Sequence, residues 1–386
     1  MTSTMEQNAA AGEIRIGVAG LGYMGALHVQ YLLRNEVNGA KLTAVCDSQI
    51  AALAIAGELD DRVARFDSFE AMAASGLIDA VFICTPHYFH PEQAIFAFEQ
   101  GLHVMIEKPA GVYTKHVREM NEAARKAGTV FGIMYNQRSL PVYNKLKELA
   151  DSGELGAIRR TNWIITDWYR PQSYYDSGSW RATWAGEGGG LLINQNPHQL
   201  DLWQWTIGMM PRRIRAFCHF GKRRRIEVED DVTAYVEYDN GATGVFVTST
   251  SDAPGTNRFE VTGDRGKVVI EENRMTFWQL SMPEEQFNLT FKGKFGQPEH
   301  RKIEIPVDCS LDFNIGQHKA ITQNWVNAIV TGEALIAPGA EGINGLTLSN
   351  AMLLSTWIDD WVQLPIDEDL FYRKLQEKIR ASEHRG

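Results

Sequence analysis

The chain has 386 residues, of which 44% are hydrophobic and 22% are charged. These fractions are close to those of ordinary soluble globular proteins, and the length predicts two domains. The formal net charge of −10 argues against a general affinity for nucleic acid or anionic membranes, because both need a basic face. We therefore expect a small-molecule partner, with no nucleic acid and no membrane.

The N-terminus and the cysteines exclude further classes of protein. Residues 1–12 are polar and Ala-rich, and no run of about 18 apolar residues follows them, so we expect a cytoplasmic protein. No histidine and carboxylate spacing resembles a catalytic metal site, and we predict no metal. The four cysteines form none of the close pairs that hold zinc or a redox disulfide, and we expect reduced thiols at Cys46, Cys84, Cys218 and Cys309.

A glycine-rich turn follows the first apolar segment. Residues 14–19 predict a buried strand and residues 27–33 a helix, and between them runs Gly20-Leu21-Gly22-Tyr23-Met24-Gly25. This order is typical of a dinucleotide site, since Gly20 allows a tight turn, Gly22 lets the backbone approach a pyrophosphate, and Gly25 packs helix on strand. The helix N-terminus then offers free N–H groups and a positive dipole end to the phosphates.

A carboxylate follows the second predicted strand, residues 41–46. Asp47 lies about 20 residues beyond the glycines, where a carboxylate can accept hydrogen bonds from the adenosine ribose hydroxyls. It would repel a ribose phosphate, and Ser48-Gln49 supplies no arginine to bind one, so we predict NAD rather than NADP. The alternative is that Asp47 only caps the next helix.

Further apolar segments alternate with helical ones as in a doubly wound parallel sheet. Strands are predicted at residues 63–66, 80–84, 104–106 and 130–134, which makes six in all. Ligands bind at the carboxyl ends of such strands. Three polar clusters stand there: Thr85-Pro86, Glu107-Lys108-Pro109 and Asn136-Gln137-Arg138. We expect an α/β Rossmann domain over residues 13–137.

The pattern changes after residue 157 from alternating helices and strands to strands in succession. They are predicted at residues 160–166, 213–220, 232–238, 242–250, 259–262, 267–271 and 274–280. Such a sheet is mostly antiparallel, and it can bury one face on helices and leave the other open as a platform or an oligomer interface. We expect residues 138–386 to form an α+β domain for substrate binding and oligomerisation, and we leave open that its C-terminal helices pack back on the first domain.

Seven aromatic residues crowd into and around a loop-like span: Trp163, Trp168, Tyr169, Tyr174, Tyr175, Trp180 and Trp184. The composition makes them poor candidates for core, and aromatic faces suit the C–H faces of sugar rings. Individual rings can instead pack between domains or subunits, but we expect one or two of them to line a pocket. Tyr169, Trp180 and the neighbouring Arg181 are our candidates for substrate binding.

A second glycine-rich stretch, residues 188–190, precedes a predicted amphipathic helix over residues 191–207. On that helix Asn194, His198 and Asp201 fall at i, i+4 and i+7 and would share one face, although Pro197 would bend it. A lone histidine on a helix is more often structural. Here it shares its face with two polar groups, which favours a catalytic role.

These motifs together resemble the glucose–fructose oxidoreductase, inositol dehydrogenase and rhizopine catabolism (Gfo/Idh/MocA) family. The resemblance rests on Gly20 to Gly25, Ile83 to His90, Glu107-Lys108-Pro109, the three glycines at 188–190, His198 and Asp201, and a tail over residues 341–367. It implies a homo-oligomer, a dimer or tetramer through the C-terminal sheet. The residues expected to bind NAD are Gly20, Gly22, Tyr23, Met24, Gly25, Asp47, Thr85, Pro86, His90, Glu107, Lys108 and Asn136.

The predicted function is hydride transfer between the nicotinamide and a secondary hydroxyl of a sugar, glycoside or cyclitol. His198, which matches the family's acid–base histidine, would take the hydroxyl proton as general base. The ammonium of Lys108 would orient the hydroxyl and stabilise the developing alkoxide, with Pro109 fixing the chain after it. Glu107 would tune the lysine or touch the cofactor, and Asn194 and Asp201 would bind substrate.

One departure and two alternatives stay open. Asn194 occupies a position where inositol-dehydrogenase-like members often carry aspartate; it can hold a hydroxyl but not a charge, so glycosides, oligosaccharides and other sugars are as plausible as myo-inositol. The alternatives are a redox-assisted glycosidase and a non-enzymatic sugar or NAD sensor. Retention of both Lys108 and His198 counts against the sensor, because a binding module needs no acid–base pair.

A basic run, Lys222-Arg223-Arg224-Arg225, stands between two predicted strands and is followed by acidic residues. We interpret it as a solvated loop, with recognition of a phosphate-bearing substrate as the minor alternative.

Overall fold

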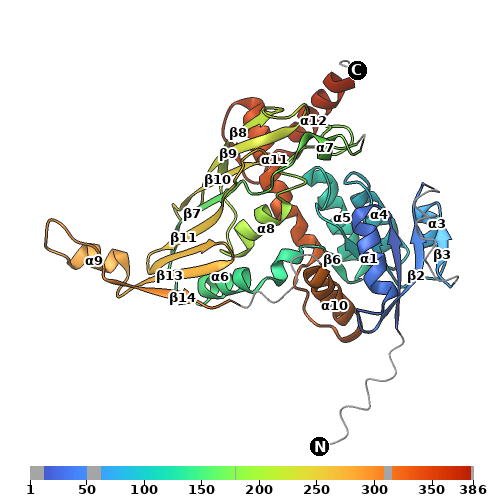
Figure 1. The fold of residues 1–386 in the computed structure, drawn as a ribbon, viewed down its shortest axis with the longest axis horizontal. Coiled ribbons are helices and arrows are strands. Elements are labelled where there is room, and N and C mark those ends of the chain that lie inside the picture. Colours follow the sequence, from blue (N-terminus) through green and yellow to red (C-terminus); the bar gives the residue numbers. More distant parts are fainter. Residues whose placement is uncertain (1–12, 50–61, 179, 308–314, 384–386) are drawn as a thin grey trace, which may run out of the picture. The chain divides into compact units, whose positions relative to one another are not determined.

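The computed structural model describes residues 13–49, 62–178, 180–307 and 315–383 (Figure 1). The predictions for residues 1–12 and for Cys309 lie outside these ranges. The chain divides into two compact units. The first comprises Met1–Gly111, His116–Asn136 and Asp312–Gly342, and the second comprises Val112–Lys115, Gln137–Leu311 and Ile343–Gly386.

A six-stranded parallel sheet organises the first unit. Its strands are β1 (Ile14–Ala19), β2 (Ala40–Cys46), β3 (Ala64–Phe66), β4 (Ala80–Ile83), β5 (His103–Ile106) and β6 (Phe131–Ile133). They lie in the order β3-β2-β1-β4-β5-β6, so the strand order reverses between β1 and β4, the position where doubly wound sheets bind ligands. The predicted strands are confirmed to within one residue at each end.

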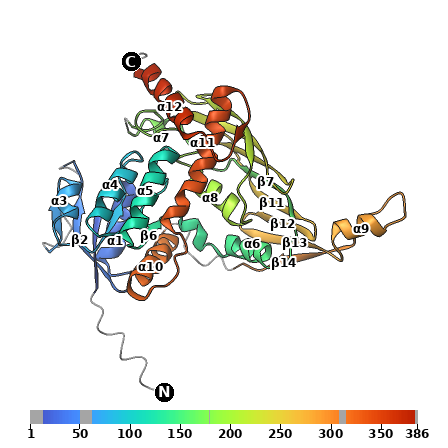
Figure 2. The ribbon, with the colours of Figure 1, turned by 180° about the vertical axis from the view of Figure 1, so that it is seen from behind.

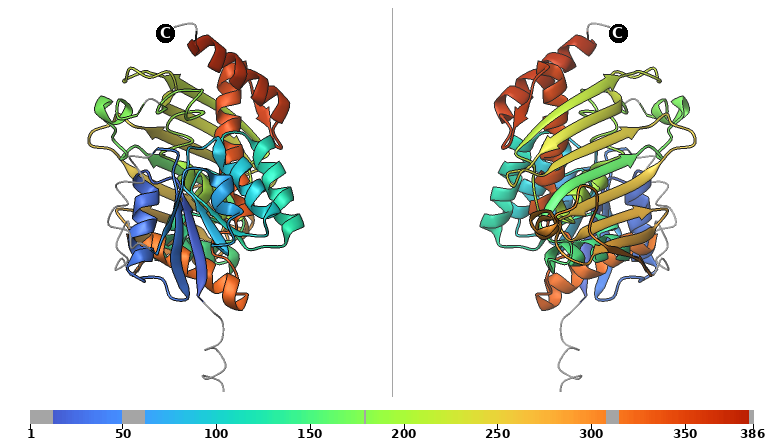
Figure 3. Two further views of the ribbon diagram at one scale, coloured as in Figure 1. Left: turned by 90° about the vertical axis from the view of Figure 1, so that its right-hand side faces the viewer. Right: turned by 90° about the vertical axis from the view of Figure 1, so that its left-hand side faces the viewer.

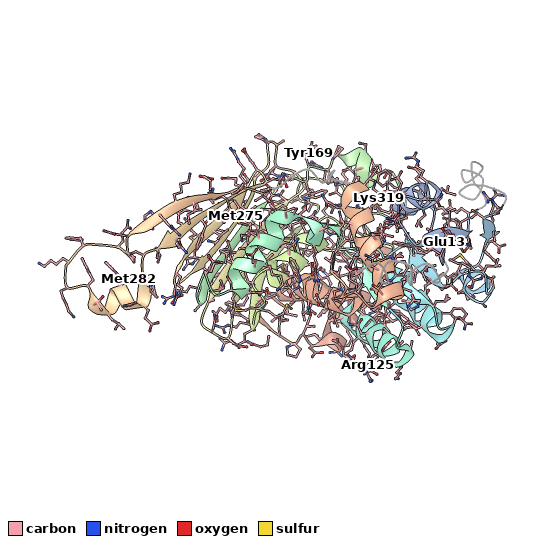
Figure 4. The ribbon with its side chains drawn as sticks, turned by 90° about the horizontal axis from the view of Figure 1, so that it is seen from below. Glu13, Arg125, Tyr169, Met275, Met282 and Lys319 are labelled. Atoms are coloured by element: carbon pink, nitrogen blue, oxygen red, sulfur yellow. The ribbon has the colours of Figure 1, made fainter. Side chains whose placement is uncertain are left out.

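Helices from both ends of the chain belong to this unit (Figure 2). They are α1 (Tyr23–Leu33), α3 (Phe69–Ala73), α4 (Phe89–Glu99), most of α5 (Thr114–Ala127), and α10 (Ile315–Thr331), with the short η3 (Gly339–Glu341). Trp325 of α10 is fully buried and meets Phe82 of β4 edge to face at 5.2 Å. Lys319, labelled in Figure 4, pairs with Glu36 at 2.9 Å. A segment of the predicted second domain thus completes the core of the first unit.

A nine-stranded sheet organises the second unit (Figure 3). Its strands are β7 (Ile158–Ile165), β8 (Arg213–Phe220), β9 (Glu229–Glu237), β10 (Thr243–Ser249), β11 (Asn257–Gly263), β12 (Gly266–Glu271), β13 (Arg274–Leu280), β14 (His300–Ile305) and β15 (Val362–Gln363). Their order is β14-β13-β12-β11-β7-β10-β9-β8-β15. Neighbours run antiparallel except β7 and β10, which confirms a mostly antiparallel sheet.

Helices cover one face of this sheet. They include α8 (Pro197–Trp205) and α11 (Gly342–Ile358), and the unit also contains α6 (Pro141–Asp151), α7 (Gln172–Tyr175), α9 (Glu284–Thr290), α12 (Glu368–Glu383) and most of η2 (Asn136–Ser139). Trp203 Nε1 of α8 donates to Thr161 of β7 at 2.9 Å, and Ser355 of α11 accepts from the Ala216 N–H of β8 at 3.0 Å. Residues of β8 alternate between buried and exposed, so the opposite face is open.

An excursion between β13 and β14 carries α9, none of whose residues is buried (Figure 1). Met282, labelled in Figure 4, lies at its start. None of the helices in the described ranges combines the length and the apolar composition that crossing a bilayer requires.

Candidate active site

The glycine turn between β1 and α1 has the shape that a pyrophosphate needs. Gly20 has φ +86°, and a Cβ there would come 2.7 Å from the Cys84 carbonyl oxygen. A Cβ on Gly25 would lie 1.7 Å from Gly20 O. At Gly22, which caps α1 without a side chain, a Cβ would meet no atom within 4 Å. Two glycines are therefore required by packing, and the third faces open space at an uncapped helix N-terminus, as a dinucleotide site requires. Next to it, Tyr23 is exposed and Met24 half-buried.

Asp47 follows β2 and holds this turn. Its Oδ2 accepts from the Leu21 N–H at 2.7 Å and its Oδ1 from the Gln49 N–H at 2.8 Å. A carboxylate offers about four lone-pair sites, so acceptor capacity is left for ribose hydroxyls. The helix that Asp47 would cap in the alternative interpretation falls in residues 50–61, outside the described ranges.

His90 connects the chain segments that follow β4 and β5. Its Nε2 lies 2.7 Å from the Thr85 carbonyl oxygen and its Nδ1 lies 2.8 Å from that of Pro109. Burial lowers the pKa of His90, although both carbonyls favour the protonated ring. The Thr85 hydroxyl donates to Gln93 at 2.7 Å, and Pro86 O accepts from the Phe89 N–H at 2.9 Å. His90 thereby ties the segment after β4 to the segment after β5, in which Lys108 directly precedes Pro109.

Glu107 is buried directly before Lys108. Its Oε1 lies 2.7 Å from His28 Nε2, and its Oε2 accepts from the Lys108 N–H at 3.1 Å. Burial alone would raise the pKa of Glu107, but the hydrogen bond from His28 and the nearby His28, His318 and Lys108 charges lower it to about 2. The carboxylate is therefore ionised, and it holds the backbone of the half-buried Lys108.

The contacts of Glu107 continue as a chain of polar groups inside the first unit. His28 Nδ1 lies 2.5 Å from the Tyr31 hydroxyl, which lies 2.8 Å from Thr322 Oγ1 of α10. Asn136, at the end of β6, also contacts α10, since its Nδ2 donates to Gln317 at 3.0 Å. The sequence offered no signal for these partners, because they are far from Glu107 and Asn136 along the chain.

The predicted helix over residues 191–207 is wrong at its start. Residues 191–196 form turns, and α8 begins at Pro197, because proline lacks an N–H and suits the first helical turn. Asn194 therefore precedes the helix and does not share a helical face with His198. Nor is α8 amphipathic, since eight of its nine residues are buried. His198 is 9% exposed.

Asp201 has a structural partner that the sequence did not indicate. Its Oδ2 accepts from Arg138 Nε and its Oδ1 from Arg138 Nη2, both at 2.7 Å, and neither side chain is more than 1% exposed. Gln204 donates a further hydrogen bond at 3.2 Å. Asp201 is therefore paired with Arg138 inside the second unit, and its predicted contact with the substrate stays a prediction.

Asn194 joins a polar network that includes three residues the sequence does not single out for the site: Tyr174, Glu187 and Gln195. Its Nδ2 donates to Glu187 Oε1 and lies 3.3 Å from the Tyr174 hydroxyl. Arg181 Nη1 lies 3.0 Å and Gln195 Nε2 3.2 Å from the same hydroxyl. The structure thus brings together Asn194 and Arg181 through Tyr174, whose only sequence signal was its place among the crowded aromatic residues.

A buried carboxyl holds the second glycine stretch. Glu229 Oε1 accepts from the N–H groups of Gly190 and Leu192, both at 3.0 Å. Burial raises the pKa of Glu229 to about 7 against these hydrogen bonds, and the charge of Glu187 adds to the rise. In the sequence, Glu229 is only one of the acidic residues that follow the basic run.

The crowded aromatic residues divide into two groups. Three are core: Trp163 stacks on Phe259 at 4.2 Å, and Tyr175 and Trp184 are buried, so the prediction that such rings make poor core is wrong for them. The other four contact guanidinium groups. The distances that follow run from a guanidinium Cζ to a ring centroid. Arg224 lies 5.1 Å from Tyr169, and Arg170 lies 5.2 Å from Trp168 and 5.0 Å from Tyr174. Arg181 lies 4.8 Å from Tyr174 and 4.7 Å from Trp180.

We call these seven residues the arginine–aromatic cluster: Trp168, Tyr169, Arg170, Tyr174, Trp180, Arg181 and Arg224. It lies wholly in the second unit. Tyr169, labelled in Figure 4, is 47% exposed, whereas the rings of Trp168, Tyr174 and Trp180 are half-buried.

Family models match both halves of the chain. Residues 14–135 match the model described as "Oxidoreductase family, NAD-binding Rossmann fold", and residues 143–269 match the "GFO/IDH/MocA C-terminal domain".

Individual proteins similar to this chain agree with the family models. The chain is 32% identical over 342 residues to inositol 2-dehydrogenase of Corynebacterium glutamicum, covering 85% of this chain and 89% of the relative. It is 28% identical over 267 residues to scyllo-inositol 2-dehydrogenase (NAD(+)) of Bacillus subtilis, covering 67% and 74%. The crystal structure of the WlbA dehydrogenase from Bordetella pertussis in complex with NADH and UDP-GlcNAcA superposes with TM-score 0.77 at 26% identity, covering 92% and 100%.

The parallel sheet, the glycine turn and these matches define an NAD-binding oxidoreductase. The chain belongs to the Gfo/Idh/MocA family, as the motifs predicted. The predictions of a Rossmann domain with NAD as cofactor and of a dehydrogenase of the sugar and polyol class are thereby confirmed at the level of the family.

Proposed function

We propose that this protein transfers a hydride between NAD and a secondary hydroxyl of a sugar, glycoside or cyclitol. The observation that carries the proposal is the turn from Gly20 to Gly25, which ends at an uncapped helix N-terminus with Gly22 facing open space. NAD, when bound, accepts or returns the hydride. The relatives described above include two inositol dehydrogenases, which supports the substrate class.

The cofactor residues of this proposal all belong to the first unit. The turn would bind the pyrophosphate through backbone N–H groups, and Asp47 would accept from the ribose hydroxyls. The remaining contacts would come from Thr85, Pro86, His90, Glu107, Lys108 and Asn136. Because Asp47 would repel a phosphate on the ribose, we propose NAD in preference to NADP.

The proton chemistry falls to Lys108 and His198. We propose that the ammonium of Lys108 orients the hydroxyl and stabilises negative charge developing on its oxygen. His198 takes the hydroxyl proton in oxidation and returns it in reduction, the work of a general acid–base group. The proposal requires both side chains to act on one hydroxyl. Asn194, Tyr169, Trp180 and Arg181 would bind the rest of the substrate.

A screen of sugars, polyols and glycosides with NAD and with NADP tests this function. We expect absorbance of the reduced nicotinamide to rise with one group of carbohydrates and to rise faster with NAD. Release of an aglycone without net reduction would contradict the proposal in favour of a redox-assisted glycosidase. Tight carbohydrate binding without either reaction would contradict it in favour of a sensor.

We also propose a cytoplasmic homo-oligomer assembled through the open face of the large sheet. Ile164, Val247, Thr233 and Phe217 lie side by side on β7, β10, β9 and β8. Ile164 is 40% and Phe217 54% exposed, and apolar rows on an open sheet face are typical of interfaces. Sedimentation should give a dimer or tetramer that Phe217→Lys weakens; a monomeric parent protein would contradict this proposal.

A further inference from the structure

The rings of the arginine–aromatic cluster hold three cations without neutralising them. Arg170, Arg181 and Arg224 make no ion pair with any carboxylate in the part of the chain that the structure describes. Some arginines elsewhere in the same unit are paired, for example Arg213, whose Nε lies 2.8 Å from Glu237 Oε2, and Arg258, whose Nη1 lies 2.6 Å from Glu271 Oε2. A ring face attracts a cation but removes none of its charge. The cluster therefore concentrates positive charge on a chain whose net charge is −10.

Two donor atoms of the cluster lack an acceptor. Arg170 Nε and Arg224 Nη2 are enclosed, and no described residue accepts a hydrogen bond from either. These two guanidinium groups donate instead to backbone carbonyls, such as Arg224 Nε to Arg170 O at 2.7 Å. An enclosed donor without an acceptor has given up its hydrogen bond to water and gained none in return. The pair of groups is therefore incomplete without an acceptor from outside the described chain.

The loop that supplies Arg224 is held in place. Gln172 of α7 accepts from the Arg225 N–H at 2.9 Å and donates to the Arg225 carbonyl at 3.3 Å. Asp230, fully buried, accepts from the N–H groups of Lys222 and Arg223 at 3.0 and 2.9 Å. The backbone of the basic run is thus held by α7 and Asp230. A ligand that binds Arg224 would therefore not lose affinity to the cost of ordering this loop.

The cluster adjoins the residues proposed to bind the sugar. The Tyr174 hydroxyl lies 3.0 Å from Arg181 Nη1 and 3.3 Å from Asn194 Nδ2, and Asn194 stands four residues before His198. The carboxylate in this network, Glu187, is bonded by Asn194 and by the Ala182 N–H at 2.6 Å. It forms no ion pair with Arg181.

We propose that the substrate carries an anionic group, a carboxylate or a phosphate, which Arg170, Arg181 and Arg224 bind. The inference rests on the proposed function and narrows it from carbohydrates in general to acidic sugars and sugar phosphates. Guanidinium groups suit both anions because their planar N–H pairs match two oxygens at once. The four rings fix the planes of the guanidinium groups, a role distinct from the sugar stacking that the aromatic composition alone suggested.

Matched sugars test the inference. Several hexoses are offered in neutral, uronate and 1-phosphate form, and kcat/KM with NAD is measured beside calorimetric binding to the NADH-loaded protein. We expect one anionic form to bind at least about 10-fold more tightly than its neutral parent, with the advantage falling as salt rises. Preference for the uronate or for the phosphate identifies the anion.

Variants locate the effect. Arg170→Gln and Arg224→Gln should each raise the Kd of the anionic sugar about 10- to 100-fold and leave that of the neutral parent unchanged. Arg224→Lys, which keeps the charge, should restore part of the affinity. Arg213→Gln is the matched control, since its guanidinium is already paired with Glu237, and it should leave both values unchanged.

Equal binding of neutral and anionic forms, unaffected by the two glutamine variants, would overturn the inference and leave the dehydrogenase proposal intact. Arginine-dependent binding of an anionic sugar without any reduction of NAD would support the anion site and contradict the dehydrogenase proposal.

Discussion

At the scale of single residues, the pKa values of two buried carboxyls, Glu107 and Glu229, are shifted in opposite directions. Glu107 meets a histidine and is held ionised, so the protein keeps a fixed negative charge behind Lys108. Glu229 meets only backbone N–H groups, and burial outweighs them. Both residues hold backbone next to a proposed catalytic residue or its approach loop, so their titration should appear in stability.

Glu107 should stabilise the protein above acidic pH. Its pKa falls from 4.5 to about 2 on folding, so its contribution is complete above pH 4.5 and is lost as the pH falls toward 2. The loss amounts to about 3 kcal/mol. Thermal unfolding of Glu107→Gln should therefore decline less between these pH values than that of the parent. Parallel declines would show that Glu107 is not the group responsible.

Glu229 should have the opposite effect. Its pKa rises from 4.5 to about 7 on folding, so its contribution is complete below pH 4.5 and is lost as the pH rises through 7. In Glu229→Gln the amide oxygen can still accept from Gly190 and Leu192, and the variant should melt higher than the parent at pH 8. A variant that melts lower at pH 8 would contradict the raised pKa.

At the scale of elements, local sequence signals were sufficient for most strands and for the cofactor turn. β-branched runs such as Ile14–Ala19 mark strands, and the glycines at 20, 22 and 25 mark the turn, because both depend on neighbours in sequence. β14 and β15 were missed, since one is largely exposed and charged and the other has two residues. The sequence alone does not locate the start of α8, because a proline such as Pro197 can either bend a helix or begin one.

Gly22→Ala separates the two uses of the glycine turn. A Cβ at Gly22 meets no protein atom within 4 Å and its φ of −64° suits alanine, so the melting temperature without cofactor should not change. The methyl group would occupy the space proposed for the pyrophosphate, and the Kd for NADH, followed by its fluorescence, should rise at least about 10-fold. Gly25→Ala, which clashes with Gly20 O, should instead lower stability. Undiminished NADH binding by Gly22→Ala would contradict the assignment of the turn.

At the scale of the whole molecule, contacts between residues far apart in the chain determine features that the sequence pattern does not predict. The first unit takes Asp312–Gly342 from the far end of the chain, and the hydrophobic pattern of α10 does not say which sheet it covers. The ion pair of Arg138 with Asp201 and the cations over the aromatic rings likewise join residues that carry no mutual signal along the chain. These contacts become evident only in the folded structure.

Trp325→Ala should show that α10 is part of the first unit. Trp325 is fully buried against Phe82, and removing such a side chain typically costs about 3–5 kcal/mol. Hydrogen exchange of β1 and β4 amides should accelerate, while exchange in the large sheet stays unchanged. Acceleration confined to the second unit would contradict the division of the chain described above.

The central claim is that Lys108 and His198 perform the proton chemistry of an NAD-dependent carbohydrate dehydrogenase. The direct measurement is the rate of NADH formation by His198→Ala and Lys108→Ala on the best substrate of the screen, with melting temperatures recorded in parallel. We expect turnover to fall about 10²- to 10⁴-fold in each variant while the melting temperature stays near that of the parent. Near-full turnover in either variant would contradict the account.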